Sequence, residues 1–276
     1  MLKLMYITNQ PELAQIAEAA GVDRIFVDME WIGKAERQRG RDTVLSHHTI
    51  ADVERIRETL HHAELLVRCN PLHPAGNGIP GTKEEIDQAV SAGADLIMLP
   101  YFFTAREPAE FLNLVAGRAK TVLLLETAEA AEHVEELLCL PGLDEMYIGL
   151  NDLSLSMGKN FLFEPLTDGT VVRICHRIQE RGIPFGFGGI AVPGQGAVPA
   201  EQIICEHYRL GSSRVILSRS FYRPGKTLDL EEATAAFQNG VKAIRRTEEE
   251  CQIHSKFFSD NLCMLKQSIR KAAVTS

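Results

Sequence analysis

Two acidic segments carry the clearest chemical signal in this sequence. Glu126 closes the apolar run "KTVLLLET" (120–127), and Asp152 follows Asn151 at the end of "EMYIGLND" (145–152). Neither acid has a lysine or arginine beside it in the chain. Such a carboxylate pair is typical of a Mg²⁺ or Mn²⁺ site, because these ions take oxygen ligands and keep open positions for water and substrate. The alternative is that each acid caps the helix that follows it.

Other polar residues end apolar runs in the same way. Asp28 and Glu30 close "RIFVDME" (24–30), and Arg68 comes near the end of "ELLVRCN" (64–70). Catalytic groups of an α/β barrel lie at the carboxyl ends of its strands, so these side chains are expected to share one rim with Glu126 and Asp152.

The elements that would position these residues repeat along the chain. Continuous apolar runs are typical of parallel strands buried on both faces, and helical patterns lie between them. Eight alternations predict an α/β fold, a (β/α)8 TIM barrel, as one catalytic domain over residues 1–228. The runs cover residues 2–8, 24–30, 64–70, 95–102, 120–127, 145–152, 184–190 and 214–221.

Residues 229–276 form a separate amphipathic helical tail in this interpretation. Its apolar side chains need a surface to cover, and we expect a neighbouring subunit to supply it. They are Phe237, Val241, Ile244, Phe257, Phe258, Leu262, Leu265 and Ile269.

Composition excludes several partners. A net charge of −8 and a pI near 5.6 argue against nucleic acid, which requires a basic face. No apolar run is long enough to span a bilayer, so no membrane partner is expected. The six cysteines show no C-x-x-C spacing and are expected to be reduced thiols in a cytoplasmic protein.

The segment "LLLETAEAAEHVEELLCLPGLDEMYIGLNDLSLSMG" (123–158) resembles the HpcH/HpaI aldolase and citrate lyase β-subunit family. The family signature is an E-T-x-E-A segment followed by G-x-x-D-L-S. "RIFVDMEW", "LLVRCN" and "AVSAGADLIMLP" occur in the family order, so the resemblance covers roughly residues 5 to 222.

The resemblance implies a role for each candidate residue. Glu126 and Asp152 would bind the divalent metal, and an α-keto acid substrate would chelate it. Backbone amides in the turn from Gly149 through Leu150 and Asn151 to Asp152 would receive the substrate carboxylate. Arg68 would stabilise the enolate oxygen. The family also forms rings or stacked trimers with exchanged C-terminal helices, which implies a homo-oligomer, a trimer or hexamer.

The general base departs from the family pattern. Aldolases of the family carry a histidine directly after the acid of the second strand, but this chain has Trp31 after Glu30. Indole cannot accept the proton. Asp28, His47 and His48 are possible substitutes. The charged run "GKAERQRGRD" (33–42) is either a solvated loop or an active-site lid that attracts an anionic substrate.

These observations favour a metal-dependent carbon–carbon lyase that cleaves or forms a 4-hydroxy-2-keto acid through the enolate of pyruvate. Asp28, Glu30 and Arg68 are its expected catalytic residues. Two alternatives remain. The first is a lyase acting on a citryl- or malyl-CoA-like thioester, and the second is a barrel that binds a keto acid without turnover.

Overall fold

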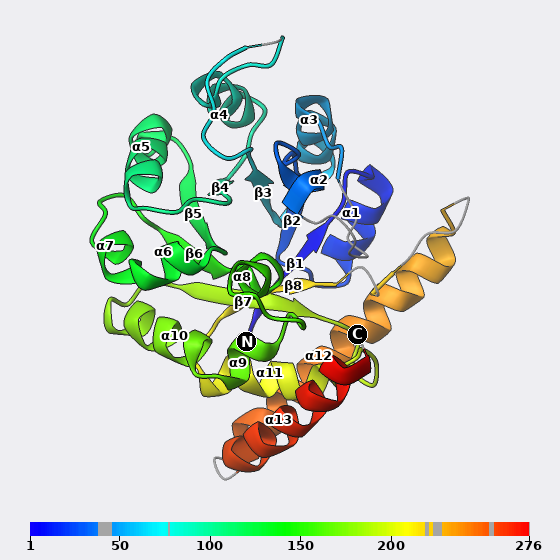
Figure 1. Ribbon diagram of the computed structural model, residues 1–276. Helices are drawn as coiled ribbons and strands as arrows, with labels where there is room; N and C mark the ends of the chain where they lie inside the picture. The colour runs from blue at the N-terminus through cyan, green and yellow to red at the C-terminus, as the bar shows by residue number, and fades with distance from the viewer. Residues whose placement is uncertain (38–45, 77, 219–220, 223–227, 254–256, 276) are drawn as a thin grey trace.

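The computed structural model is a closed barrel of eight parallel strands surrounded by helices (Figure 1). The structure describes residues 1–37, 46–76, 78–218, 221–222, 228–253 and 257–275. The strands are β1 (Lys3–Ile7), β2 (Arg24–Asp28), β3 (Glu64–Arg68), β4 (Leu96–Leu99), β5 (Lys120–Leu125), β6 (Glu145–Ile148), β7 (Phe185–Ile190) and β8 (Arg214–Leu217).

Helices follow the strands and cover the outside of the barrel. They are α1 (Pro11–Ala19), α2 (Lys34–Arg37), α3 (Ile50–Thr59), α4 (Thr82–Ser91), α5 (Arg106–Val115), α6 (Ala128–Glu132), α7 (Val134–Leu138), α8 (Leu150–Ser156), α9 (Glu164–Thr167), α10 (Thr170–Glu180), α11 (Ala200–Arg209), α12 (Leu230–Ile253) and α13 (Phe257–Thr275).

The predicted barrel is confirmed. Each predicted apolar run contains one strand, and β1 pairs with β8 to close the sheet. Side chains on the outer faces of the strands pack under the helices. A smaller inner layer that includes Phe26, Met98 and Leu124 fills the barrel. Both faces of every strand are therefore buried, which explains why the strand sequences are apolar without alternation.

The C-terminal helices pack on the outside of the same barrel. α12 and α13 both contact α11, and α12 also contacts α1 (Figure 1). Phe237, Ile244, Leu265 and Ile269 are buried by this packing within one chain. Much of the apolar face that suggested a neighbouring subunit is thus covered by the chain itself, while Phe258 and Leu262 are only partly buried. The homo-oligomer and the division into domains 1–228 and 229–276 stay predictions.

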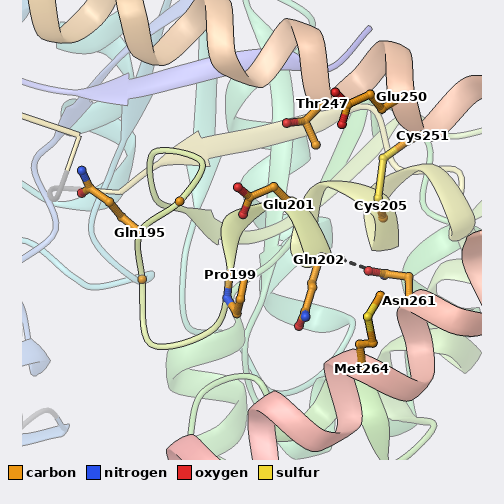
Figure 2. A pocket seen from close by; sticks show the side chains of 12 residues that line it. Gln195, Pro199, Glu201, Gln202, Cys205, Thr247, Glu250, Cys251, Asn261 and Met264 are labelled. Atoms are coloured by element: carbon orange, nitrogen blue, oxygen red, sulfur yellow. Dashed lines mark hydrogen bonds between the residues drawn. A yellow bond between two sulfur atoms is a disulfide. The ribbon is translucent and has the colours of Figure 1, made fainter.

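The expectation that all six cysteines are reduced thiols is wrong for two of them. Cys205 on α11 and Cys251 on α12 form a disulfide with a Cα–Cα distance of 5.7 Å. The disulfide lies beside a cavity of about 390 Å³ between α11, α12 and α13. The side chains that line this cavity are drawn in Figure 2. Asn261 of α13 donates a hydrogen bond to the carbonyl of Gln202 on α11 at 3.0 Å. The two tail helices are therefore each fastened to α11.

No helix in the described ranges has the length and apolar content needed to cross a membrane.

Candidate active site

A cavity of about 510 Å³ opens at the carboxyl ends of the barrel strands. Phe26 and Met98 of the inner layer lie at its base, and the segments after β6 and β7 form part of its wall. The charged side chains that line it are Asp28, Lys34, Arg68, Glu126 and Asp152. The predicted strand-end residues Asp28, Arg68, Glu126 and Asp152 therefore share one cavity.

Asp28 and Arg68 form a two-point ion pair. They are register partners on β2 and β3. Arg68 donates from Nε to Oδ1 of Asp28 at 2.8 Å and from Nη2 to Oδ2 at 2.7 Å. Burial alone would raise the pKa of Asp28, but Arg68 and Lys34 outweigh it and hold the pKa well below its usual range. Asp28 is therefore a charged partner that fixes the guanidinium.

Glu30 is buried beside the same ion pair. Its carboxylate lies 3.3 Å from Nη1 of Arg68 and 3.2 Å from Nζ of Lys34, and it also accepts a hydrogen bond from Arg37. Burial would raise the pKa of Glu30, but the positive charges of Arg68, Lys34 and Arg37 lower it. Two carboxylates and three cations thus form one cluster at the ends of β2 and β3.

Glu126 has the opposite electrostatic environment. It is only 3% exposed, and burial together with the negative charges of Glu30 and Asp152 raises its pKa well above the usual range. Its Oε1 accepts a hydrogen bond from the backbone N–H of Tyr101 at 3.0 Å. Tyr101 has a φ of 48°, a left-handed conformation that is strained for a tyrosine. This backbone conformation directs the N–H of Tyr101 at the carboxylate of Glu126.

Gly149 makes room for Glu126. The N–H of Gly149 donates to the carbonyl of Leu125 at 3.0 Å, which sets Gly149 opposite the end of β5. A Cβ on Gly149 would lie 2.7 Å from Oε2 and 2.9 Å from Cβ of Glu126. Only glycine fits there without moving the carboxylate.

The capping alternative does not describe the two acids. Thr127, not Glu126, is the N-cap of α6, and its hydroxyl accepts from the N–H of Ala130 at 3.2 Å. α8 starts after Gly149, and Asp152 lies buried in its first turn, where Asn151 donates to it at 3.3 Å. The N–H groups at the start of this helix have no intrahelical acceptor. They are the amides expected to receive a substrate carboxylate.

The substitutes for the family histidine are poorly placed as bases. Nδ1 of His48 accepts the backbone N–H of Asp28 at 3.0 Å, and burial lowers the pKa of His48. A neutral imidazole has a single acceptor nitrogen, and here it is already occupied. His47 is exposed. Trp31 is 48% exposed and is absent from the described residues that line the cavity.

Sequence reasoning missed Lys34, Arg37 and Tyr101. Lys34 and Arg37 belong to the charged run 33–42, but they fold back on Asp28 and Glu30 as α2 instead of facing solvent. The guanidinium of Arg37 also lies 3.7 Å from the centre of the Tyr101 ring. The spacing of Lys34 four residues after Glu30 is the one available signal. Residues 38–42 of the run lie outside the described residues.

The carboxylate pair fits a hard divalent cation. In the described part of the chain, no group of three or more His, Cys, Asp or Glu side chains is arranged for a metal. Glu126 and Asp152 both line the cavity and would offer two carboxylate ligands. Two ligands suit Mg²⁺, which keeps several waters and binds substrate oxygens. The cation would also offset the repulsion that raises the pKa of Glu126.

A protein-family model described as HpcH/HpaI aldolase/citrate lyase matches residues 3–162. The matched segment is more than half of the chain and holds all five strand-end candidates, from Asp28 to Asp152. The chain belongs to the HpcH/HpaI aldolase/citrate lyase family. No curated protein matches it significantly.

Solved structures of HpcH/HpaI proteins share its fold. One from Burkholderia cenocepacia is 16% identical, with a TM-score of 0.60 and coverage of 91% of this chain and 94% of that one. An HpcH/HpaI aldolase from Desulfitobacterium hafniense is 14% identical, with a TM-score of 0.57 and coverage of 88% and 93%. The citrate synthase SbnG is 13% identical, with a TM-score of 0.58 and coverage of 79% and 85%. At these identities the likeness establishes the barrel and leaves the substrate open.

Proposed function

We propose that this HpcH/HpaI family protein is a divalent-metal-dependent carbon–carbon lyase. It would form or cleave a 4-hydroxy-2-keto acid through the enolate of pyruvate. The family typically depends on a divalent metal. The observation that carries the proposal is the placement of Glu126, Asp152 and Arg68 in one cavity, because enolate formation needs positive charge where the keto oxygen lies.

Glu126 and Asp152 would hold the metal, as their oxygen donors and position on neighbouring strand ends suggest. When bound, a divalent cation supplies Lewis-acid polarisation of the keto oxygen. Tyr101 orients Glu126 through its backbone N–H.

Arg68 is suited to bind the oxygen that becomes negative. A guanidinium has five N–H donors, and three of them face Asp28 and Glu30. The remaining two are available for the keto oxygen as the methyl proton leaves. Because Asp28 grips Arg68 at two points, the guanidinium is preorganised and does not have to reorient during the reaction.

The remaining contacts position the substrate. Backbone N–H groups of Leu150 and Asn151, at the start of α8, are suited to receive the pyruvate carboxylate. Phe161 and Phe163 pack edge to face with ring centres 5.7 Å apart, and both line the cavity. Their apolar surface would exclude water from the reacting carbon.

Proton NMR of pyruvate in D₂O tests this function without a choice of aldehyde. With Mg²⁺, the wild-type protein is expected to exchange the methyl protons for deuterium, and the signal disappears. EDTA or Glu126→Ala should abolish the loss. Glu132→Ala is the matched control, because this exposed glutamate on α6 lies outside the cavity and should leave the exchange rate unchanged.

Metal-dependent pyruvate binding without exchange would refute the aldolase. A CoA-thioester lyase is then tested by turnover of citryl-CoA and malyl-CoA. If neither is cleaved, the protein is a keto-acid-binding barrel without turnover.

A further inference from the structure

We propose that the second substrate of this reaction is an aldehyde that carries an apolar substituent. The substituent lies against an apolar wall on one side of the active-site cavity, and pyruvate lies beside the charged groups. This inference rests on the proposed function and deepens it, because it names the chemical class of the aldehyde. The apolar wall consists of Leu162, Phe163, Ile190, Ala197, Val198 and Ile203.

The apolar wall lies opposite the charged cluster at the ends of β2 and β3. In the closed barrel, β3 and β7 are on opposite sides of the ring of strands. Arg68 ends β3, and Ile190 of the apolar wall ends β7. The other wall residues come from the segment before α9, the segment between β7 and α11, and α11 itself. One side of the cavity is therefore charged and the other is apolar.

The apolar wall begins beside the expected pyruvate site. Leu150 starts α8, where backbone N–H groups are suited to receive the pyruvate carboxylate. A Cβ on Gly188 of β7 would lie 2.7 Å from Cδ1 of Leu150 and 3.8 Å from Cε1 of Phe163, so these two side chains meet at the same point of β7. The cavity of about 510 Å³ holds more than pyruvate alone. An aldehyde beside pyruvate would thus rest its substituent on the apolar wall.

The cations of the cavity are already paired on the other side. Lys34 and Arg68 are the only cations among the described residues that line it. Nζ of Lys34 lies 2.9 Å from Asp28 and 3.2 Å from Glu30. Arg68 donates to Asp28 at two points. A charged group on the aldehyde would lose its hydration against the apolar wall without gaining a partner, whereas an alkyl group gains free energy by leaving water.

Pyruvate and the aldehyde are the only reactants. A methyl C–H bond of pyruvate breaks, and the resulting enolate carbon forms a bond to the carbonyl carbon of the aldehyde. The electron pair of the carbonyl π bond moves to its oxygen, which takes up one proton in place of the proton lost from the methyl group. The product is a 4-hydroxy-2-keto acid with an apolar substituent on carbon 4.

A matched pair of aldehydes tests the inference. 4-Methylpentanal and 4-oxobutanoate have the same chain, but an isopropyl group in the first replaces the carboxylate of the second. With pyruvate and Mg²⁺, kcat/KM is expected to be at least about 100-fold higher for 4-methylpentanal. From propanal to pentanal, kcat/KM should rise about 4-fold for each methylene that is buried. An equal or higher value for 4-oxobutanoate, or no dependence on chain length, would overturn the inference.

Leu162→Ala tests the contact with the apolar wall. Leu162 is partly exposed and lines the cavity, so its truncation removes apolar surface from the aldehyde site. The preference for pentanal over propanal should fall at least about 3-fold, since less of each methylene is buried. This ratio is the readout, because a change in the enolate-forming step affects both aldehydes equally. Leu230→Ala is the matched control: Leu230 is 49% exposed on α12, outside the cavity lining, and its variant should keep the wild-type ratio.

Ala197→Arg should reverse the discrimination in part. Ala197 is exposed where it lines the cavity, so an arginine can be placed there without entering the core. The new guanidinium should raise kcat/KM for 4-oxobutanoate relative to 4-methylpentanal by about 10-fold, the effect of one charge-assisted hydrogen bond. Ala197→Met adds a long side chain without charge and should not favour 4-oxobutanoate. An unchanged ratio in Ala197→Arg would mean that the substituent lies elsewhere and would contradict the inference.

The outcomes separate this inference from the proposed function. If wild-type protein does not exchange the pyruvate methyl protons, the proposed function fails and the aldehyde class fails with it. If the protons exchange but 4-oxobutanoate is the better substrate, only the apolar aldehyde is refuted. Exchange without turnover of either aldehyde also refutes it, and leaves the enolate-forming step intact.

Discussion

Glu126 and Glu145 are buried glutamates on neighbouring strands, but they lie at opposite ends of the barrel. Glu126 follows β5 at the open end, where burial, Glu30 and Asp152 raise its pKa. Glu145 starts β6 at the other end, where burial is outweighed by Arg214 and Arg24, and its pKa is lowered. One carboxylate is held among like charges beside a cavity, and the other is neutralised by the fold.

The surroundings of Glu145 explain the difference. Arg24, only 1% exposed, bridges Glu145 at 2.9 Å and Glu64 at 2.7 Å, and Arg214 adds a contact to Glu145 at 3.0 Å. None of these four residues is among the described residues that line the open-end cavity. A cluster whose charges pair with one another supports the barrel, whereas acids that line one cavity and repel each other are suited to a ligand.

Breaking the closed-end cluster should give the largest change in stability. Arg24→Met removes the shared partner of the buried Glu145 and the partly exposed Glu64 and is expected to cost about 3–5 kcal/mol of unfolding free energy. Urea denaturation measures the loss. Lys3→Met is the control, because the exposed Lys3 ion pair to Glu64 is expected to contribute at most about 1 kcal/mol.

Pyruvate exchange by folded Arg24→Met should equal that of wild type. A large fall in the exchange rate would mean that the two ends of the barrel are coupled. The closed-end charges could then not be said to support the fold alone.

Glu126→Gln should change function, whereas Arg24→Met should change stability. Removing one metal ligand is expected to lower pyruvate exchange about 100- to 1000-fold, comparable to the loss of a group that stabilises developing charge. Proton NMR in D₂O with Mg²⁺ measures the rate. A variant that kept wild-type exchange would show that Glu126 is not a metal ligand.

The same glutamate pair predicts opposite pH dependences of stability in EDTA. The folded-state pKa of Glu126 is raised, so its contribution is fully present below the unfolded pKa and is lost as pH rises through the folded pKa. Glu126→Gln should therefore gain stability over wild type as pH increases. Glu145 has a lowered pKa, so its contribution is present above the unfolded pKa and is lost as pH falls.

Urea titrations of both Gln variants at several pH values check these signs. Glu145→Gln should be less stable than wild type near neutral pH, and the difference should shrink as the solution is acidified. Parallel pH curves for the two variants would contradict the assigned environments.

The sequence predicted the barrel because its strands must be apolar on both faces. It predicted the meeting of Asp28, Arg68, Glu126 and Asp152 because strand ends of a barrel converge. Lys34 escaped prediction, since its direction depends on how the turn after Glu30 folds α2 back. The composition of the charged run does not show that its first residues pack back against Asp28 and Glu30.

Two further features depended on contacts between distant segments. The Cys205–Cys251 disulfide required α11 and α12 to pack together, and their separation of 46 residues gave no sign of it. Tyr101 holds Glu126 with a backbone N–H, so its residue type carried no signal. Interactions made by the main chain, or between helices placed by the whole fold, are outside what local patterns report.

Gly149→Ala tests whether the open end is shaped around its carboxylate. Gly149 has a φ of −81°, which suits any residue, so the cost comes from the contact of the new Cβ with Glu126. Overpacking of this kind is expected to cost about 1–3 kcal/mol, and displacing Glu126 should also weaken Mg²⁺ binding. Calorimetric titration and urea denaturation measure the two effects.

Gly189→Ala is the matched control for this last change. Gly189 lines the same cavity, but a Cβ there would meet only the carbonyl oxygen of Ile216 at 3.5 Å, an ordinary contact. It should keep Mg²⁺ affinity. If Gly149→Ala also kept its Mg²⁺ affinity while losing stability, the glycine would serve packing alone. The open end of the barrel would then support the fold as the closed end does, despite the raised pKa of Glu126.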